Sequence, residues 1–470
     1  MDHPPRTAED WLRAFACGQA LPSDAWAACR AALDAHDGRI NAVPTRVPPE
    51  ALAPAFAAAD ARARSGEPVG VLAGLPYVAK DLFDTAGVRT TYGSPIFADH
   101  VPLHDAAVVA RTKAAGAILI GKSNTPEFAA GSQTFNPVLG ATCNPHDPSR
   151  TAGGSSGGAA AALACGMTVL ADGSDLAASL RNPASFCGVV GLRPGGYLDP
   201  SLQPEANAFG TLSVVGPLAR AVTDCEIAWR ALFGPPAPRP AAAWPAWIDS
   251  LVRDEPAPRA LRLAWSADFG GLPVERAVRA AFGRALDALR DAGCGLVEAH
   301  PDFSGADEAF QTLRALYFVE QLGGLHETDR ARMKDTVVWN VERGLALDVR
   351  EIARANRLRS AVFARVAAFM RGYDALLAPA AQVLPFALGT PYPTRVDGAP
   401  LATYIDWLKG CYWISVSAHP AIVIPAGRAV PEGGQVALPV GLQLVGRFGG
   451  EAALFGVART LERALARLER

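Results

Sequence analysis

The sequence predicts an α/β protein in which a large mixed β-sheet lies between layers of helices. From about residue 68 onward, short apolar runs with strand character alternate with runs of helical periodicity. Such alternation is typical of a parallel or mixed sheet that helices cover on both faces. The chain has 470 residues, of which 50% are hydrophobic, so it can bury a large core.

The first 40 residues predict two helices that pack as an arm on the main body. Thr7 and Asp10 have the spacing of a capping box before an apolar-periodic run. Ser23 is the candidate cap of a second helix that ends near Gly38. We therefore expect residues 1–60 to form an N-terminal helical arm.

The α/β alternation follows this arm. We expect a strand at residues 75–80, a helix at residues 106–115 and a buried strand at residues 117–120. Residues 234–258 are rich in proline and alanine, lack periodicity and predict a connector. We expect residues 61–470 to form a single domain that contains this connector.

A further α/β unit and a helical segment follow the connector. Residues 261–265 resemble a strand, and Pro273 suits the first turn of a helix with apolar residues at helical spacing. Those residues are Val274, Val278, Ala281, Ala285 and Leu289. Residues 304–373 are mostly helical in pattern. Their aromatic residues could line an acyl pocket, although core packing is the more common role; they include Tyr317, Phe318 and Trp339.

Charge and cysteine content argue against several classes of function. The formal net charge is −2 with acidic and basic residues intermixed, which favours a small neutral substrate over a nucleic acid or a membrane surface. The eight cysteines show no zinc-site spacing, and we expect neither metal nor cofactor. The N-terminus lacks an apolar signal region, and residues 159–170 are too short to span a bilayer. A soluble cytoplasmic protein is expected.

Lysine is scarce in this chain, which draws attention to Lys80. Only five of the 44 basic residues are lysines, so arginine is used at most positions where a positive charge suffices. Arginine keeps its proton in a protein, whereas a desolvated lysine can lose several pKa units and act as a base. Lys80 is therefore a candidate base, although a structural role is common for a single lysine.

A run of glycine and serine at residues 153–158 contains Ser155 and Ser156, and Ser179 lies 24 positions after Ser155. Glycine-rich backbone can hold Ser155 and Ser179 close together, and such a pair needs only a base to become a nucleophile and its proton relay. With Lys80 as that base, the pattern predicts a serine hydrolase that uses no histidine.

Other interpretations of these motifs are weaker. Residues 116–123 satisfy the phosphate-loop pattern, but a predicted strand occupies their middle, so no nucleotide site is expected. Ser155 and Ser156 each match G-x-S-x-G, yet turn-forming residues precede them where a nucleophile elbow needs a strand. That elbow also needs a histidine, and the candidates are His300, His326 and His419. A passive anion cradle at the next helix would leave Ser179 and Lys80 without a role.

Five blocks of this sequence, in order, resemble the amidase signature family. That family includes fatty-acid amide hydrolase, bacterial aryl and aliphatic amidases and the A subunit of glutamyl-tRNA amidotransferase. The blocks are residues 74–81, 121–127, 153–158, 179–194 and 438–447. The resemblance implies the amidase signature fold, in which a large mixed sheet is sandwiched between helices.

The resemblance also implies a catalytic triad. Ser179 would be the acyl nucleophile, Ser155 a bridging serine after a cis peptide bond at Gly154, and Lys80 the base. A neutral Lys80 would draw a proton from Ser155, which would draw one from Ser179 as that oxygen attacks an amide carbon.

Backbone groups complete the implied site. The oxyanion would be held by the N–H groups of Leu176, Ala177, Ala178 and Ser179. The backbone at Ala129 and Gly131 would face the substrate.

Asp175 and Arg181 flank the nucleophile, and we expect them to pair and hold its loop.

The family usually has at least one glycine where this chain has Ala177 and Ala178. A Cβ there is tolerated only if φ stays negative, and it narrows the space beside the reacting carbonyl. We therefore expect the two alanines to reduce activity or to restrict the substrate to narrow acyl groups.

The function that this resemblance implies is hydrolysis of a small carboxamide, with release of ammonia or an amine. Two alternatives stay open: a glutaminase-like subunit that passes ammonia to a partner chain, and a non-catalytic scaffold or binding protein. The sequence leaves the amide unspecified, because the pocket depends on the orientations of Trp339, Tyr404, Trp407 and Trp413. An apolar face on the N-terminal arm could form a homodimer.

Overall fold

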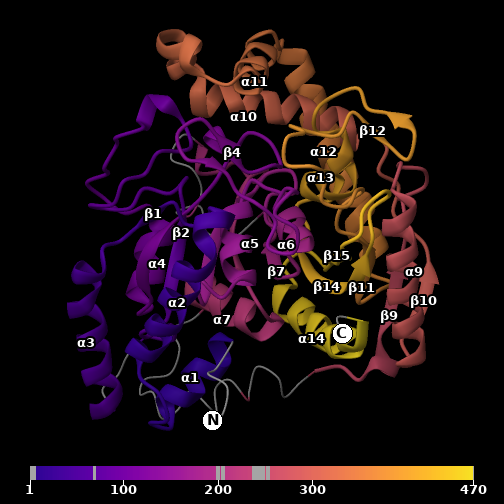
Figure 1. Cartoon of the computed structure of the whole chain (residues 1–470). Coiled ribbons are helices and arrows are strands. Elements are labelled where there is room, and N and C mark those ends of the chain that lie inside the picture. The colour runs from indigo at the N-terminus through magenta and orange to yellow at the C-terminus, as the bar shows by residue number, and fades with distance from the viewer. Residues whose placement is uncertain are drawn as a thin grey trace.

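The computed structural model describes residues 7–66, 70–196, 202, 207–234, 249 and 255–468 (Figure 1). Most of the predicted connector at residues 234–258 lies outside the described residues. The largest cluster of buried apolar residues extends from Ala8 near the N-terminus to Leu465 in the last helix.

One mixed sheet organises the described residues. Its eleven strands lie in the order β1-β3-β2-β6-β8-β7-β14-β15-β11-β9-β10. Strands β3, β2 and β6 are parallel neighbours, as are β11, β9 and β10, whereas antiparallel pairs join the strands between these groups. The strands are β1 (Thr45–Arg46), β2 (Pro76–Lys80), β3 (Ile118–Ser123), β6 (Leu170–Asp175), β7 (Val190–Arg193), β8 (Val214–Ala219), β9 (Arg262–Trp265), β10 (Gly295–Glu298), β11 (Ala375–Pro379), β14 (Ala421–Ala429) and β15 (Leu438–Val445).

Helices flank this sheet and confirm the predicted α/β class. Helices α5 and α6 contact each other and the central strands, while α7, α9 and α14 form a second connected group. Figure 1 shows α10 and α11 beyond one end of the sheet. The helices are α1 (Ala8–Ala16), α2 (Pro22–Ile40), α3 (Pro49–Ser65), α4 (Ala107–Ala114), α5 (Gly157–Ala164), α6 (Arg181–Cys187), α7 (Val222–Phe233), α9 (Arg276–Asp291), α10 (Ala306–Asp329), α11 (Asp335–Leu345), α12 (Val349–Met370), α13 (Lys409–Val416) and α14 (Glu451–Leu465).

The N-terminal residues form helices, as predicted, with one correction at a cap. The capping box of Thr7 and Asp10 is present at the start of α1. Helix α2 begins at Pro22 and continues to Ile40, so Ser23 lies inside it and is not its cap. The Ser23 hydroxyl instead donates to Asp60 Oδ2 at 2.7 Å, a contact that joins α2 to α3.

The later elements also follow the predicted order, with shifted boundaries. The buried strand β3 continues to Ser123, so the apparent phosphate loop is strand, as expected. Helix α9 begins at Arg276, and Pro273 therefore lies before the helix instead of in its first turn. The predicted helical segment at residues 304–373 is confirmed by α10, α11 and α12. In the described part of the chain, no helix has the length and apolar character that crossing a membrane requires.

Candidate active site

The site lies where β2 and β6 run side by side beneath the loop that leads into α5. Lys80 is the last residue of β2, and β6 is a parallel neighbour of that strand. A Cβ on Gly173 of β6 would lie 2.5 Å from Ser156 Oγ. Glycine at this position therefore lets the serine loop approach the sheet closely.

Lys80 is surrounded by hydroxyl groups. Its side chain is fully buried, and its Nζ lies 2.7 Å from Ser155 Oγ and 3.1 Å from the hydroxyl oxygens of Ser156 and Ser174. Burial lowers the pKa of Lys80 to about 7, although the charges of Asp172 and Asp175 oppose this shift. Both protonation states of Lys80 are therefore accessible near neutral pH.

The serine loop is connected to the predicted nucleophile through the backbone. The peptide bond between Gly154 and Ser155 is cis. The backbone N–H of Ser156 donates to the carbonyl oxygen of Ser179 at 3.2 Å, and Ser132 Oγ donates to the carbonyl oxygen of Gly154 at 2.6 Å. The structure thus gathers Lys80, Ser155 and Ser179 at one place.

A cavity of about 760 Å³ opens onto these serines. Ser155, Ser174 and Ser179 line it, and so do Ala129 and Gly131, which the resemblance implied as substrate contacts. Their role as substrate contacts stays a prediction.

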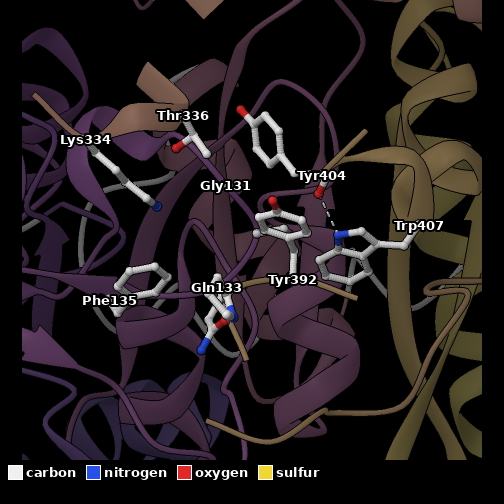
Figure 2. A pocket seen from close by; sticks show the side chains of 10 residues that line it. Gly131, Gln133, Phe135, Lys334, Thr336, Tyr392, Tyr404 and Trp407 are labelled. Atoms are coloured by element: carbon white, nitrogen blue, oxygen red, sulfur yellow. Dashed lines mark hydrogen bonds between the residues drawn. The ribbon is translucent and has the colours of Figure 1, made fainter. Parts of the chain in front are cut away.

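The aromatic residues singled out in the sequence lie in different places: four line two pockets, one packs in the core and one is partly exposed. Tyr317 and Phe318 line the large cavity. Tyr404 and Trp407 line a neighbouring pocket of about 30 Å³, where Trp407 Nε1 donates to the carbonyl oxygen of Tyr404 (Figure 2). Trp413 packs against Phe303 in the core. Trp339 is 38% exposed and belongs to neither pocket.

The loop before the nucleophile presents free N–H groups. Within the described part of the chain, no hydrogen bond uses the N–H of Ala177, Ala178 or Ser179. Leu176, Ala177 and Ser179 line the cavity, whereas Ala178 is fully buried. Neither alanine is among the residues with positive φ, so their Cβ atoms cause no backbone strain.

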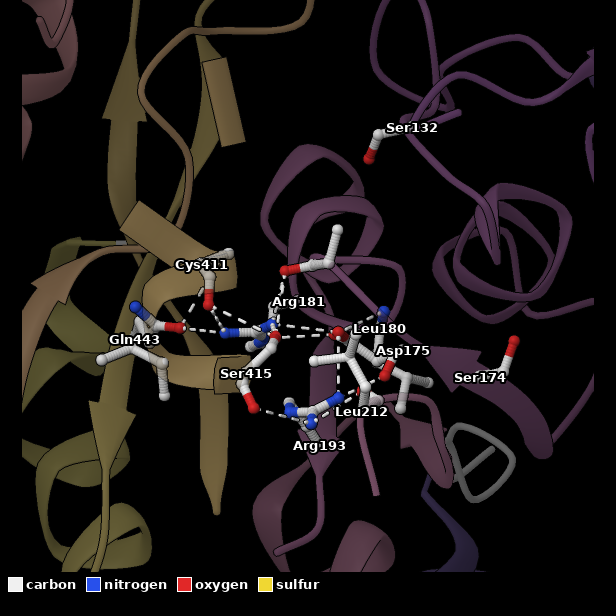
Figure 3. Close-up of polar contacts among 12 residues, drawn as sticks. Ser132, Ser174, Asp175, Leu180, Arg181, Arg193, Leu212, Cys411, Ser415 and Gln443 are labelled. Carbon is white, nitrogen blue, oxygen red and sulfur yellow. Dashed lines mark hydrogen bonds and ion pairs between the residues drawn. The ribbon is translucent and has the colours of Figure 1, made fainter. Parts of the chain in front are cut away.

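An ion-pair network holds this loop, as predicted for Asp175 and Arg181 (Figure 3). Arg181 Nε and Nη2 donate to the two carboxylate oxygens of Asp175 at 3.0 and 2.9 Å. Arg193 adds a second cation 3.5 Å from Asp175, and all three side chains are fully buried. Burial raises the pKa of Asp175, but the two arginines outweigh that effect and keep it below its usual value. This carboxylate therefore stays ionised and fixes the end of β6.

Sequence analysis named Ser156 only as part of the glycine-serine run, and it missed Ser174 and Asp172, the other two neighbours of Lys80. Asp172 Oδ1 accepts from the backbone N–H of Lys80 at 2.7 Å, and its Oδ2 accepts from the Tyr77 hydroxyl at 3.1 Å. Asp172 and Ser174 are two residues apart on a strand, so they point to the same face. The two-residue separation of Asp172 and Ser174 within one strand was the sequence signal that could have identified them.

The histidines considered for an elbow triad lie outside this cavity. His419 is buried beside Ser417, and His326 lies 3.7 Å from Glu342. His104 does line the cavity, but no hydrogen bond in the described part of the chain joins it to either serine. Residues 143–156 run through bends and isolated bridges without a strand entering Ser155.

Comparison with known proteins gives a consistent answer. The amidase family model matches residues 24–455. The A subunit of glutamyl-tRNA(Gln) amidotransferase from Anaeromyxobacter sp. (strain K) is 35% identical over 467 residues, covering 93% of this chain and 91% of the relative. An acylamidase of Rhodococcus erythropolis is 32% identical, covering 85% and 83% of the two chains.

A solved structure agrees with these sequence relatives. A bacterial aryl acylamidase of the amidase signature family superposes with a TM-score of 0.84 at 25% identity, covering 97% of this chain and 96% of that chain. The chain therefore belongs to the amidase signature family, and cleavage of an amide C–N bond is the chemistry that this membership assigns to it.

Proposed function

We propose that the protein hydrolyses a small carboxamide through an acyl-enzyme on Ser179. The observation that carries this proposal is the contact of 2.7 Å between the fully buried Lys80 Nζ and Ser155 Oγ, beside a cavity that Ser179 also lines. A nucleophile of this kind needs a base within hydrogen-bonding reach.

The proposed mechanism begins with neutral Lys80. Its lone pair takes the proton of Ser155, which takes the proton of Ser179 as the Ser179 oxygen attacks the amide carbon. The tetrahedral intermediate then expels the amine, which receives its proton back from Lys80 through Ser155. A water molecule attacks the acyl-enzyme over the same relay, and the carboxylate product leaves.

The oxyanion would be bound by the N–H groups of the loop before the nucleophile. The proposal assigns this role to Leu176, Ala177, Ala178 and Ser179. The N–H groups of the last three have no partner within the described chain, which leaves them available. Donors of this kind each contribute about 3–4 kcal/mol to transition-state stabilisation in comparable sites.

The test is labelling followed by turnover. A fluorophosphonate should label wild-type protein at Ser179, identified by mass spectrometry, and leave Ser179→Ala unlabelled. Ammonia or amine release from a panel of aliphatic, aromatic and amino-acid amides should disappear in the same variant. A well-folded wild-type protein that neither reacts with the fluorophosphonate nor hydrolyses any amide of the panel would refute the proposal.

A second candidate function is a glutaminase-like subunit that supplies ammonia to another protein. The observation in its favour is the 35% identity to the A subunit of an amidotransferase over 93% of this chain. Isolation of the protein from its source under mild conditions distinguishes the two: a stoichiometric second chain, and glutamine hydrolysis that depends on it, would favour this candidate.

A further inference from the structure

Arg314 is a buried arginine in the wall of the cavity that holds the serines. It lies on α10, is 3% exposed, and lines the same space as Ser155 and Ser179. Among the described residues that line this cavity, it is the one lysine or arginine. The cavity that contains the reactive serines therefore also presents a fixed positive charge.

The contacts of Arg314 are all with neutral groups. Its guanidinium donates to Asn340 Oδ1 on α11 and to the Tyr404 hydroxyl. It also lies over the rings of Phe318 and Tyr404, at 4.9 and 5.2 Å from their centroids. No carboxylate within the described residues forms an ion pair with it.

Arg181 is a fully buried arginine whose counter-charge lies within the chain. Its guanidinium pairs with both oxygens of Asp175 in a fully buried site. A buried charge without a counter-charge is strongly unfavourable, which is why such groups are usually paired. A carboxylate on a bound ligand would supply the counter-charge that the described residues do not give to Arg314.

A second side chain of α10 supports the same conclusion. Gln321 also lines the cavity, and its buried Nε2 has no hydrogen-bond partner in the described part of the chain. Arg314 and Gln321 are seven residues apart, which places them on one face of the helix. An unused amide donor and an unpaired guanidinium therefore lie on the same wall.

The carboxylates that line this cavity have other partners. Asp105 Oδ1 lies 2.8 Å from Lys113 Nζ, and Asp84 accepts a hydrogen bond from the Tyr92 hydroxyl. Neither forms an ion pair with Arg314, so the positive charge of that guanidinium stays available for a ligand.

We propose that Arg314 binds a carboxylate group of the substrate, with Gln321 as an additional donor. This inference rests on the proposed amidase function and narrows its substrate class to small amides that carry a carboxylate. A guanidinium suits this role because its fork of N–H donors matches the two oxygens of a carboxylate.

The experiment compares amides with and without a terminal carboxylate. Monoamides of linear dicarboxylic acids, from malonamate to adipamate, are assayed beside neutral aliphatic amides of equal length. At the optimal length, we expect kcat/KM of the wild type to be about 10- to 100-fold higher for the charged amide, the range typical of a charge-assisted hydrogen bond.

Variants then assign this preference to Arg314. In Arg314→Gln, kcat/KM should fall at least about tenfold further for the charged amide than for its neutral counterpart, with the change mainly in KM. Arg314→Lys should keep part of the preference, since it keeps the charge but loses the fork. Arg343→Gln, which removes an exposed arginine on the adjacent helix α11, is the matched control and should keep the wild-type preference.

Binding provides a test that does not depend on turnover. Glutarate and adipate should raise the melting temperature of Ser179→Ala, and adding Arg314→Gln should abolish that shift. A wild type without preference for charged amides at any length overturns the inference while leaving the amidase proposal intact. Equal losses on charged and neutral amides in Arg314→Gln would overturn it as well. Dicarboxylate binding through Arg314 without turnover or labelling would instead refute the amidase proposal alone.

Discussion

Lys80 and Lys122 are two buried lysines on neighbouring parallel strands, and their surroundings differ. Lys80 ends β2, and Lys122 lies on β3 opposite Ala79. Both side chains are fully buried. Burial lowers the pKa of both, to about 7 for Lys80 and about 8 for Lys122. Burial and pKa therefore do not separate a base from a structural cation here.

The hydrogen-bond partners separate them. Lys122 Nζ donates to the carbonyl oxygen of Phe83 and lies 2.7 and 3.1 Å from the hydroxyls of Thr85 and Thr90. Those hydroxyls donate to the carbonyl oxygens of Phe83 and Val88, so they accept from Lys122. Three acceptors require the three protons of an ammonium group.

The partners of Lys80 impose no such requirement. All three are serine hydroxyls, each able to donate or accept. A neutral amine can donate to two of them and accept a proton from the third, Ser155. A lysine that acts as a base is therefore distinguished from a structural cation by hydrogen-bond partners that can donate a proton to it.

The largest expected effect is on activity at Lys80. Lys80→Ala and Lys80→Arg should both lower kcat/KM by about 10²- to 10⁴-fold, the usual contribution of a general base. Arginine fails because it does not release its proton. Steady-state assays on the best amide measure this, with melting temperatures as the folding control. Near-normal activity in Lys80→Arg would exclude lysine as the base.

At Lys122 the expected loss is in stability. Lys122→Met removes the donor for the Phe83 carbonyl and the cation that faces buried Asp81, so we expect about 3–5 kcal/mol of destabilisation in urea unfolding. The folded fraction should keep kcat/KM within about tenfold of wild type, because the proposed proton transfer does not pass through this residue. A rate loss equal to that of Lys80→Ala, at unchanged stability, would remove the distinction between the two lysines.

The pH dependence follows from the protonation state of Lys80. Its pKa of about 7 means that the base is neutral above that pH and charged below it. We expect kcat/KM to rise about tenfold per pH unit below 7 and to level off above it. Rates measured in constant-ionic-strength buffers from pH 5 to 9 define this rise, which is the acid limb of the pH profile. A profile that is flat over this range would contradict a titrating base.

Asp172 should produce the smallest effect. Its charge raises the pKa of Lys80, so Asp172→Asn should move the acid limb to lower pH, by about half a unit to one unit. The amide oxygen can still accept from the backbone N–H of Lys80. Asp81→Asn, which alters the charge beside Lys122, is the matched control and should leave the limb nearly in place. A shift to higher pH in Asp172→Asn would show that this charge acts in the opposite sense.

Much of the site could be predicted from sequence because its chemistry depends on few residue types. Scarce lysine and a glycine-serine run identified Lys80, Ser155 and Ser179 as candidates, and strand periodicity located β2 and β3 within a few residues. The role of Lys122 was not predictable, because scarcity singles out both lysines equally. Its partners Thr85 and Thr90 come from a loop whose fold depends on tertiary contacts.

Arg314 was missed for a related reason. Helical periodicity shows that it lies on α10, but whether that face meets a cavity depends on how α10 packs against α11 and the loop before α13. Ser23 illustrates a local failure: it is a good cap by residue type, yet Pro22 starts the helix and Asp60 takes the serine hydroxyl.

The measurement that tests the central claim most directly is the rate of fluorophosphonate inactivation as a function of pH, which requires no knowledge of the substrate. We predict that the rate constant for wild type and for Lys122→Arg rises through about pH 7, with the adduct on Ser179. In Lys80→Ala the rate should be low and should lose this limb. An unchanged limb in Lys80→Ala would contradict the assignment of Lys80 as the base that activates Ser179.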